Sequence, residues 1–191
     1  REGFDDLASW GADSVRCNIG GGSICSTRTQ TGHGLPGLQT IFDCALSDYA
    51  QDVKIIADGG IKNSGDIVKA LAAGADFAMV GSLLAGTIET PGEVHHRTDG
   101  TRYKTYRGMA SKDAQQTWRN RTGSIEGVST VVPFKGSVGD VLNELKVGIR
   151  SGLSYSGARS ISELQAKAVF VSQTPAGQIE STAHILRGSS R

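Results

Sequence analysis

The sequence is poor in cysteine, and the few cysteines it has form no pattern. Its 191 residues include only three, Cys17, Cys25 and Cys44. An odd number of cysteines without metal-ligand spacing argues against a disulfide framework and against a zinc site. It favours a reducing, cytoplasmic compartment in which the thiols are free, unless one of them is catalytic.

Long apolar runs and an excess of charge are also absent. No run approaches the roughly 18 apolar residues that a membrane-spanning helix needs. The acidic, amphipathic residues 1–15 do not resemble a signal peptide. The net charge is +1, so we expect neither nucleic acid nor membrane as a partner. Because the chain begins with Arg1 rather than Met, we expect it to be a piece of a longer protein.

Glycine is abundant, with 26 residues, and many of them follow predicted strands. Three short apolar runs, residues 13–19, 53–59 and 76–82, predict buried parallel strands that end in Gly or Gly-Ser. Apolar residues at helical spacing predict helices over residues 36–50 and 64–73, the second beginning at a capping serine. The order strand–helix–strand–helix–strand indicates a parallel α/β fold.

Three parallel strands cannot close a barrel, and they leave open sheet edges. They complete either a doubly wound sheet or the last three strands of a TIM (β/α)₈ barrel. The barrel interpretation predicts functional loops after the carboxyl end of each strand, which is where the unusual residues fall.

The second half of the chain departs from this alternation. Residues 95–108 predict a β-hairpin, and the polar residues 110–130 predict a mobile loop or flap. Helical spacing returns over residues 137–152, and residues 160–171 predict a capped helix leading into a short strand. Residues 183–191 are expected to be disordered. The resulting single domain comprises strand–helix units over residues 1–94, a hairpin and flap over 95–136, and the last helices and tail over 137–182.

Residues 19–28, "IGGGSICSTR", form a glycine loop directly after the first predicted strand. The exposed N–H groups of such a loop and the Ser23 hydroxyl can surround a phosphate, and its carbonyls can bind a monovalent cation. A tight turn without a ligand is an equal alternative. Asp58 suits a pair of ribose hydroxyls, unless it caps a helix or turn. Further strand-end residues that could join a phosphate cradle are Gly59, Gly60, Gly81 and Ser82.

Cys25 lies beside this predicted phosphate loop. An exposed thiol in a cationic or N–H-rich setting is a good nucleophile. Arg28 could lower the pKa of Cys25, and Thr27 could relay a proton. The other two cysteines, Cys17 and Cys44, fit an inert core, since one lies on a strand and the other on the apolar face of a helix.

Five segments in order resemble the IMP dehydrogenase and GMP reductase family, from about residue 11 to 182. They are "IGGGSICSTRTQTGHG", "IIADGGIKNSGDIVKALAAGADFAMVGSLLAGTIETPGE", "YKTYRGMAS", "IEGVS" and "VPFKGSV". The resemblance implies a TIM barrel in a homotetramer that acts at C2 of a purine nucleotide, IMP/XMP or GMP, with NAD or NADP. It further implies that Cys25 attacks C2 to form a covalent thioimidate, with Thr27 as its acid/base neighbour.

The resemblance also assigns the other site residues. The phosphate would be held by Ser23, Gly60, Gly81, Ser82 and Tyr106, and the ribose by Asp58. The base would face Gly108, Met109 and Glu126. A potassium ion would be bound by the carbonyls of Gly20, Gly22 and Cys25, completed by Glu180, Ser181 and Thr182 of a neighbouring subunit.

The two activities of this family diverge in the flap. A dehydrogenase activates water with an Arg-Tyr pair, assisted by a threonine–glutamate pair, whereas a reductase pairs the threonine with a glutamate after the "RGM" turn. Lys112, followed by Asp113, occupies the position of the reductase glutamate. Glu126 fits the position of the assisting glutamate of dehydrogenases. Arg119 or Arg121 would act as the base without a tyrosine. These features favour IMP dehydrogenase, with GMP reductase and a non-catalytic nucleotide-binding relative as alternatives.

Overall fold

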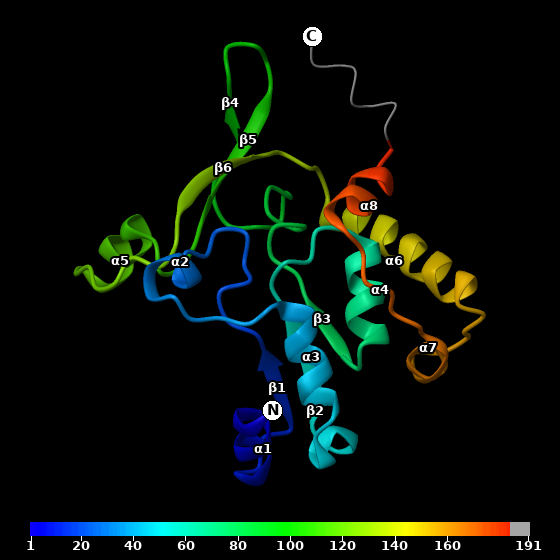
Figure 1. The fold of residues 1–191 in the computed structure, drawn as a ribbon. Helices are drawn as coiled ribbons and strands as arrows, with labels where there is room; N and C mark the ends of the chain where they lie inside the picture. Colours follow the sequence, from blue (N-terminus) through cyan, green and yellow to red (C-terminus); the bar gives the residue numbers. More distant parts are fainter. Residues whose placement is uncertain (184–191) are drawn as a thin grey trace.

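The computed structural model describes residues 1–183 and shows an α/β fold with two small sheets (Figure 1). The first sheet is parallel, in the order β1 (Ser14–Cys17), β2 (Lys54–Asp58) and β3 (Phe77–Met79). Cys17 lies opposite Ala57, and Asp58 lies opposite Met79. The predicted strand–helix order is therefore confirmed, while most of the tail predicted to be disordered lies outside the described residues.

Helices cover one face of the parallel sheet. Val15, Cys17, Ile55 and Ala57 point to this face and are buried in one core cluster, together with Ile41 of α3 (Gly37–Ala45) and Phe4 of α1 (Glu2–Ser9). On the opposite face the side chains of Phe77 and Met79 are 57% and 44% exposed. The prediction of fully buried strands is therefore wrong, because nothing within residues 1–183 covers this second face. No closed barrel forms within these residues either.

The ends of the first helices differ slightly from the prediction. α3 stops at Ala45, and a 3₁₀ turn, η1 (Asp48–Gln51), follows it. α4 (Ser64–Ala72) is capped by Asn63 rather than by the predicted serine, because Asn63 Oδ1 accepts the N–H of Asp66 at 2.9 Å.

The second sheet is antiparallel and lies beyond the carboxyl ends of the parallel strands, at the end of the molecule opposite α1 (Figure 1). β4 (His95–His96) and β5 (Arg102–Arg107) form the predicted hairpin. A third strand, β6 (Ser129–Pro133), and a helix, α5 (Lys112–Arg119), were not predicted. Within the segment expected to be a flap, residues 112–119 form this helix, whose N-cap Ser111 accepts the N–H of Ala114. Residues 120–126 have no regular secondary structure, as expected for a loop.

A buried lysine joins the two halves of the fold. Lys104 of β5 is 1% exposed, and its ammonium donates to the carbonyls of Thr87 (3.0 Å), Ile88 (3.4 Å) and Thr90. These carbonyls belong to the loop after β3, so the antiparallel sheet is tied to the carboxyl end of the parallel sheet.

Three helices complete the described chain: α6 (Val138–Tyr155), α7 (Ile161–Lys167) and α8 (Pro175–Glu180). A second core cluster joins α4, α6 and α7 around Leu164. The predicted cap of α7 is confirmed, since Ser160 Oγ accepts the N–H of Glu163. The predicted strand after α7 is wrong: residues 168–174 have no regular secondary structure, and Phe170 packs edge-on against Phe42, with ring centroids 4.9 Å apart.

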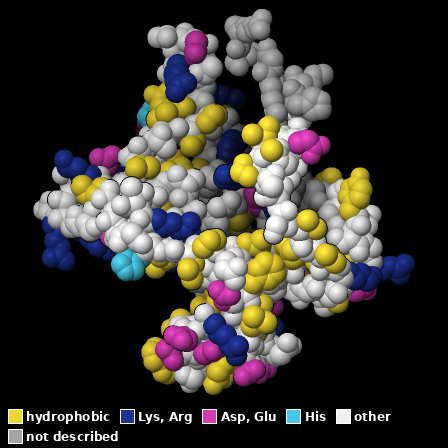
Figure 2. All heavy atoms as spheres, in the orientation of Figure 1, with side chains coloured by type: hydrophobic (Ala, Val, Ile, Leu, Met, Phe, Trp, Pro, Cys, Tyr) yellow, Lys and Arg dark blue, Asp and Glu magenta, His cyan; other side chains and the backbone are white. Residues whose placement is uncertain are grey.

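The surface drawn in Figure 2 carries charges of both signs. Around α1, at the bottom of the view, acidic and basic side chains are interspersed, and hydrophobic side chains gather above them. None of the helices in residues 1–183 has the length and apolar character that crossing a bilayer requires.

Candidate functional site

The carboxyl ends of β2 and β3 and the loop after β1 surround a cleft of about 180 Å³. This is the edge at which parallel α/β folds place their sites. The cleft brings together seven residues predicted from the sequence: Ser23, Asp58, Gly59, Gly60, Gly81, Ser82 and Tyr106. The Tyr106 hydroxyl reaches across Gly81, because a Cβ on that glycine would lie 3.1 Å from it. Binding of phosphate by this group remains a prediction.

Lys62 also lines the cleft, although it is not among the residues predicted from the sequence. A phosphate dianion in this cleft would meet its positive charge. The sequence feature that could have indicated this role is a basic residue two positions after the Gly-Gly pair at the end of the strand.

Asp58 lies at the mouth of this cleft, at the end of β2. Its carboxylate pairs with the guanidinium of Arg16 on β1, and the Asp58 side chain stays 25% exposed. It is not a helix cap, since α4 is capped by Asn63. A carboxylate held here keeps lone pairs for a further donor, which fits the predicted contact with ribose hydroxyls.

Replacement of Asp58 by alanine is expected to weaken nucleotide binding by about 2 kcal/mol, because charge-assisted hydrogen bonds are lost. Isothermal titration of the full-length protein with IMP and GMP measures this. Asp6→Ala, on exposed α1, is the matched control. An Asp58→Ala protein with unchanged affinity would show that the carboxylate does not contact the ligand.

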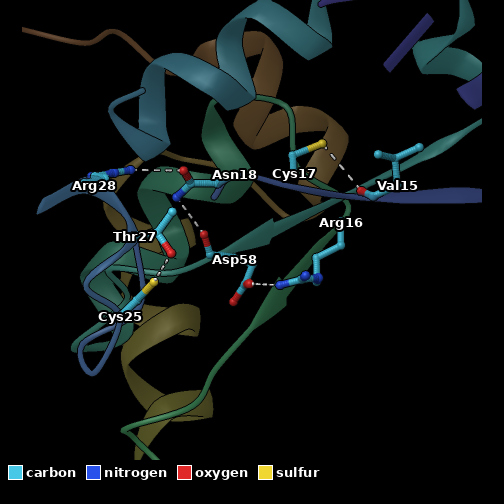
Figure 3. A network of polar contacts seen from close by, with 8 residues as sticks. All are labelled: Val15, Arg16, Cys17, Asn18, Cys25, Thr27, Arg28 and Asp58. Carbon is cyan, nitrogen blue, oxygen red and sulfur yellow. Dashed lines mark hydrogen bonds and ion pairs between the residues drawn. The ribbon is translucent and has the colours of Figure 1, made fainter. Parts of the chain in front are cut away.

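A chain of two hydrogen bonds links the predicted nucleophile to an acidic residue 101 positions away in sequence. The exposed Cys25 thiol donates to Thr27 Oγ1 at 3.2 Å, as Figure 3 shows. The Thr27 hydroxyl in turn donates to Glu126 Oε2 at 2.8 Å. The bond from Thr27 lowers the pKa of Glu126, with a further bond to Ser124 acting the same way. The site therefore holds a thiol, a hydroxyl and an ionised carboxylate in proton-transfer order.

Main-chain pairing holds these side chains in place. Cys25 forms an antiparallel bridge with Gly127, through bonds from Ser26 N to Glu126 O (2.8 Å) and from Val128 N to Ile24 O (2.9 Å). On its other side, the 126–128 segment pairs with residues 108–110, through bonds from Gly108 N to Val128 O and from Glu126 N to Ala110 O. Three segments thus lie side by side, with residues 126–128 between the cysteine loop and residues 108–110. The contact of Gly108, Met109 and Glu126 with a purine base remains a prediction.

Gly127, in the middle of these three segments, leaves no room for a side chain. A Cβ there would lie 3.0 Å from Ser111 N and 3.2 Å from the carbonyl carbon of Ala110, both main-chain atoms. Gly127→Ala is expected to cost about 1–3 kcal/mol of unfolding free energy and to lower turnover by displacing Glu126. Denaturation and steady-state rates measure both. Gly3→Ala, in open space on α1, is the control; equal stability of the two variants would contradict the packing.

The two arginines predicted as bases line a second cavity, of about 510 Å³, together with Met109 and Glu126. Arg119 is the last residue of α5, and Arg121 follows two positions later. The cavity places both near the end of the relay. Lys112 and Asp113 are the first two residues of α5 and do not line this cavity.

Gln115 is a positioning residue that the sequence did not reveal. It is 6% exposed, and its Nε2 donates to the carbonyls of Ala110 (3.0 Å) and Ser124 (2.8 Å). Its Oε1 accepts the N–H of Gly123 at 2.7 Å. These three bonds tie α5 to Ala110 and to residues 123–124, which lead into Glu126. In the sequence, a glutamine within a polar segment gives no indication of this role.

The predicted potassium ligands fall into two separate groups. The carbonyls of Gly20, Gly22 and Cys25 lie in the loop after β1, and neutral carbonyl oxygens suit a monovalent cation. Ser181 and Thr182 follow α8, which Figure 1 places on the opposite side of the molecule from α2 (Thr27–Thr31). The structure therefore does not bring Glu180, Ser181 and Thr182 to the cysteine loop of the same chain.

The roles predicted for the remaining cysteines and for Arg28 have different outcomes. Cys17 and Cys44 are buried in the core, as predicted. They lie against each other, and hydrogen bonding and burial raise the pKa of Cys17. Arg28 donates to Asn18 and to the carbonyls of Ile19 and Leu35. Its guanidinium points away from Cys25 (Figure 3), so the predicted effect of Arg28 on the Cys25 thiol is not supported.

Comparison with known proteins identifies relatives over almost the whole chain. A family model described as "IMP dehydrogenase / GMP reductase domain" matches residues 1–184. Inosine-5'-monophosphate dehydrogenase of Nitrosopumilus maritimus is 46% identical over 195 residues, which cover 96% of this chain and 41% of that protein. GMP reductase of Leishmania major is 44% identical over 193 residues, covering 96% and 39%.

A solved structure is similar over the same share of this chain. It is a cysteine-to-alanine variant of GMP reductase from Trypanosoma brucei in complex with guanosine 5'-monophosphate, with a TM-score of 0.89 and 45% identity. The match covers 96% of this chain and 38% of that one. The chain therefore spans about two-fifths of the length of the relatives it matches.

Proposed function

The chain belongs to the IMP dehydrogenase / GMP reductase family, and from this we propose that it is the carboxyl-terminal part of a TIM-barrel enzyme that oxidises or reduces purine nucleotides at C2. The activity we favour is IMP dehydrogenase, which converts IMP, NAD and water to XMP and NADH. The observation that carries the proposal is the hydrogen-bonded series Cys25–Thr27–Glu126 beside the cleft at the strand ends.

In this mechanism the nucleotide is held at its phosphate and at its ribose. Ser23, Gly60, Gly81, Ser82 and Tyr106 bind its phosphate, and Asp58 binds its ribose. The base then extends toward Gly108 and Met109, with C2 above Cys25.

The chemical step uses the relay in both directions. As the Cys25 sulfur bonds to C2, its proton passes to Thr27 Oγ1, and the Thr27 proton passes to the Glu126 carboxylate. NAD bound here would accept hydride from C2, a two-electron oxidation that would leave the nucleotide linked to Cys25 as a thioimidate. Water then adds to C2 and the C–S bond breaks, which releases XMP, and the Cys25 sulfur takes back its proton from Glu126 through Thr27. Arg119 or Arg121, in the cavity next to Glu126, would take the proton of the water from a neutral guanidine form, since a guanidinium cation has no lone pair to accept it.

A monovalent cation fits the same loop. The carbonyls of Gly20, Gly22 and Cys25 would hold potassium, which would fix the loop that carries the nucleophile. Because Glu180, Ser181 and Thr182 lie elsewhere in the same chain, they would complete the ion site from a neighbouring copy, in a cytoplasmic homotetramer.

GMP reductase, which converts GMP and NADPH to IMP and ammonia, is the second candidate. Two observations favour it: the flap is short and lacks the Arg-Tyr pair of dehydrogenases, and a GMP reductase is a solved structure of similar fold. Against it, Lys112 stands where reductases have a glutamate.

Nicotinamide absorbance of the full-length enzyme separates the candidates. Two reactions are followed with potassium present: IMP with NAD, and GMP with NADPH. A rise with IMP is expected. A fall with GMP instead would identify a reductase, in which Asp113 or Glu126 replaces the missing glutamate. Binding of nucleotide without any turnover would support a non-catalytic relative and overturn the proposal.

A further inference from the structure

Asn18, the residue after β1, has a main-chain conformation that side chains rarely adopt. Its φ is 93°, and within residues 1–183 only one other non-glycine residue, Asn120, has a positive φ. Glycine is the residue that ordinarily occupies this region, because it has no Cβ. Glycine would be unstrained at this position, yet asparagine is present. The asparagine side chain therefore calls for a structural role.

The Asn18 amide bonds to two other elements at once. Its Nδ2 donates to the main-chain carbonyl of Asp58 at 2.8 Å, and its Oδ1 accepts from Arg28 Nη2 at 3.1 Å (Figure 3). Arg28 stands next to Thr27 at the start of α2. The side chain therefore connects the end of β2, which carries the predicted ribose ligand, to the helix turn that carries the proton relay.

Arg28 extends this connection around the glycine loop. Its Nε donates to the carbonyl of Ile19 at 3.3 Å, and its Nη2 also bonds the carbonyl of Leu35. The guanidinium thus fixes both the beginning of the loop and the segment that follows α2.

Two glycines make room for the amide. A Cβ on Gly21 would collide with Asn18 Nδ2, and one on Gly37 would lie 2.9 Å from it. A third glycine, Gly59, packs directly on Gly21, where a Cβ would lie 2.8 Å from the Gly21 carbonyl carbon. Asn18 is half-buried, and its Nδ2 lies in this close packing.

We propose that Asn18 is a positioning residue that, through its amide bonds to the Asp58 carbonyl and to Arg28, sets the distance between the nucleophile loop and the ribose-binding strand end. This role rests on the proposed function, because it concerns how Cys25 meets C2 of a nucleotide whose ribose is held by Asp58. Reactions of bound groups depend steeply on such distances. Asn18 touches neither the reacting atoms nor the nucleotide, so its loss acts on the rate rather than on binding.

The test is Asn18→Gly in the full-length enzyme. Glycine suits the positive φ without strain, so it removes the amide bonds and keeps the turn. We expect kcat to fall at least 10-fold, with KM and nucleotide affinity within threefold of the original enzyme. Normal kcat would show that Asn18 is only a turn residue and would overturn the proposal. A raised KM with normal kcat would overturn it too, by assigning the side chain to binding.

A second measurement does not depend on turnover. Iodoacetamide alkylates exposed thiols, and peptide mapping reads the rate at Cys25 separately from Cys17 and Cys44. We expect Asn18→Gly and Arg28→Met each to change this rate at least threefold, and the double variant to change it no further than the larger single effect, because the two residues act as one unit. Unchanged or additive rates would overturn the proposal.

The two measurements separate failure of the inference from failure of the proposed function. If the unaltered enzyme turns over neither IMP nor GMP, the proposed function fails, and the alkylation rates alone decide whether Asn18 positions the loop. Asn120→Gly, the other residue of positive φ, is the matched control and should leave the Cys25 rate unchanged.

Discussion

Cys25→Ala is expected to lower turnover of IMP by about 10⁴-fold or more, because the covalent route through the sulfur is lost. Affinity for IMP should stay within about threefold, since the phosphate and ribose contacts come from other residues. Steady-state rates and isothermal titration of the full-length enzyme measure the two quantities.

The control for this variant is Cys44→Ala. Cys44 lies in the core and reaches no part of the cleft, so its replacement should leave turnover intact once the protein is folded. A normal rate in Cys25→Ala would refute the nucleophile. A large loss of affinity in that variant would show that the thiol contributes to binding rather than to chemistry.

Glu126→Gln is expected to lower kcat by about 10²-fold or more, because an amide cannot take the proton that arrives through Thr27. The bond from Thr27 lowers the pKa of Glu126, so the carboxylate stays ionised to a lower pH than an ordinary glutamate. The relay is therefore lost at a lower pH than it would be without this bond. Between about pH 5 and 7, therefore, protonation of Glu126 should not reduce the rate of the original enzyme.

A pH–rate profile of both proteins checks this expectation. Glu144→Gln, on the exposed surface of α6, is the control. An acid limb in the original enzyme near or above pH 5 that disappears in Glu126→Gln would contradict the lowered pKa. An unchanged kcat in Glu126→Gln would remove the carboxylate from the mechanism.

The strand ends of this fold could be predicted because their signals are local. Apolar runs that end in glycine marked β1, β2 and β3, and the residues after them meet at one edge in any parallel sheet. For the same reason the amino-acid sequence alone is enough to expect Ser23, Asp58 and Gly81 in one cleft, where they lie.

The flap could not be predicted in the same way, because its order comes from distant partners. β6 gains its place by pairing with β5, and Glu126 is fixed by main-chain bonds to Ser26 and Ala110. Such pairings leave no periodic pattern in a polar sequence. The amides of Gln115 and Asn18 likewise look like surface groups until the carbonyls that they satisfy are known.

The uncovered face of the parallel sheet has a consequence for handling the protein. Phe77 and Met79 lie exposed there, and β1 and β3 each present an unpaired edge within the described residues. Open strand edges beside an apolar surface recruit other chains, so residues 1–191 expressed alone should aggregate at concentrations at which the full-length protein stays dispersed. Light scattering of the two preparations would register this difference before any assay of activity.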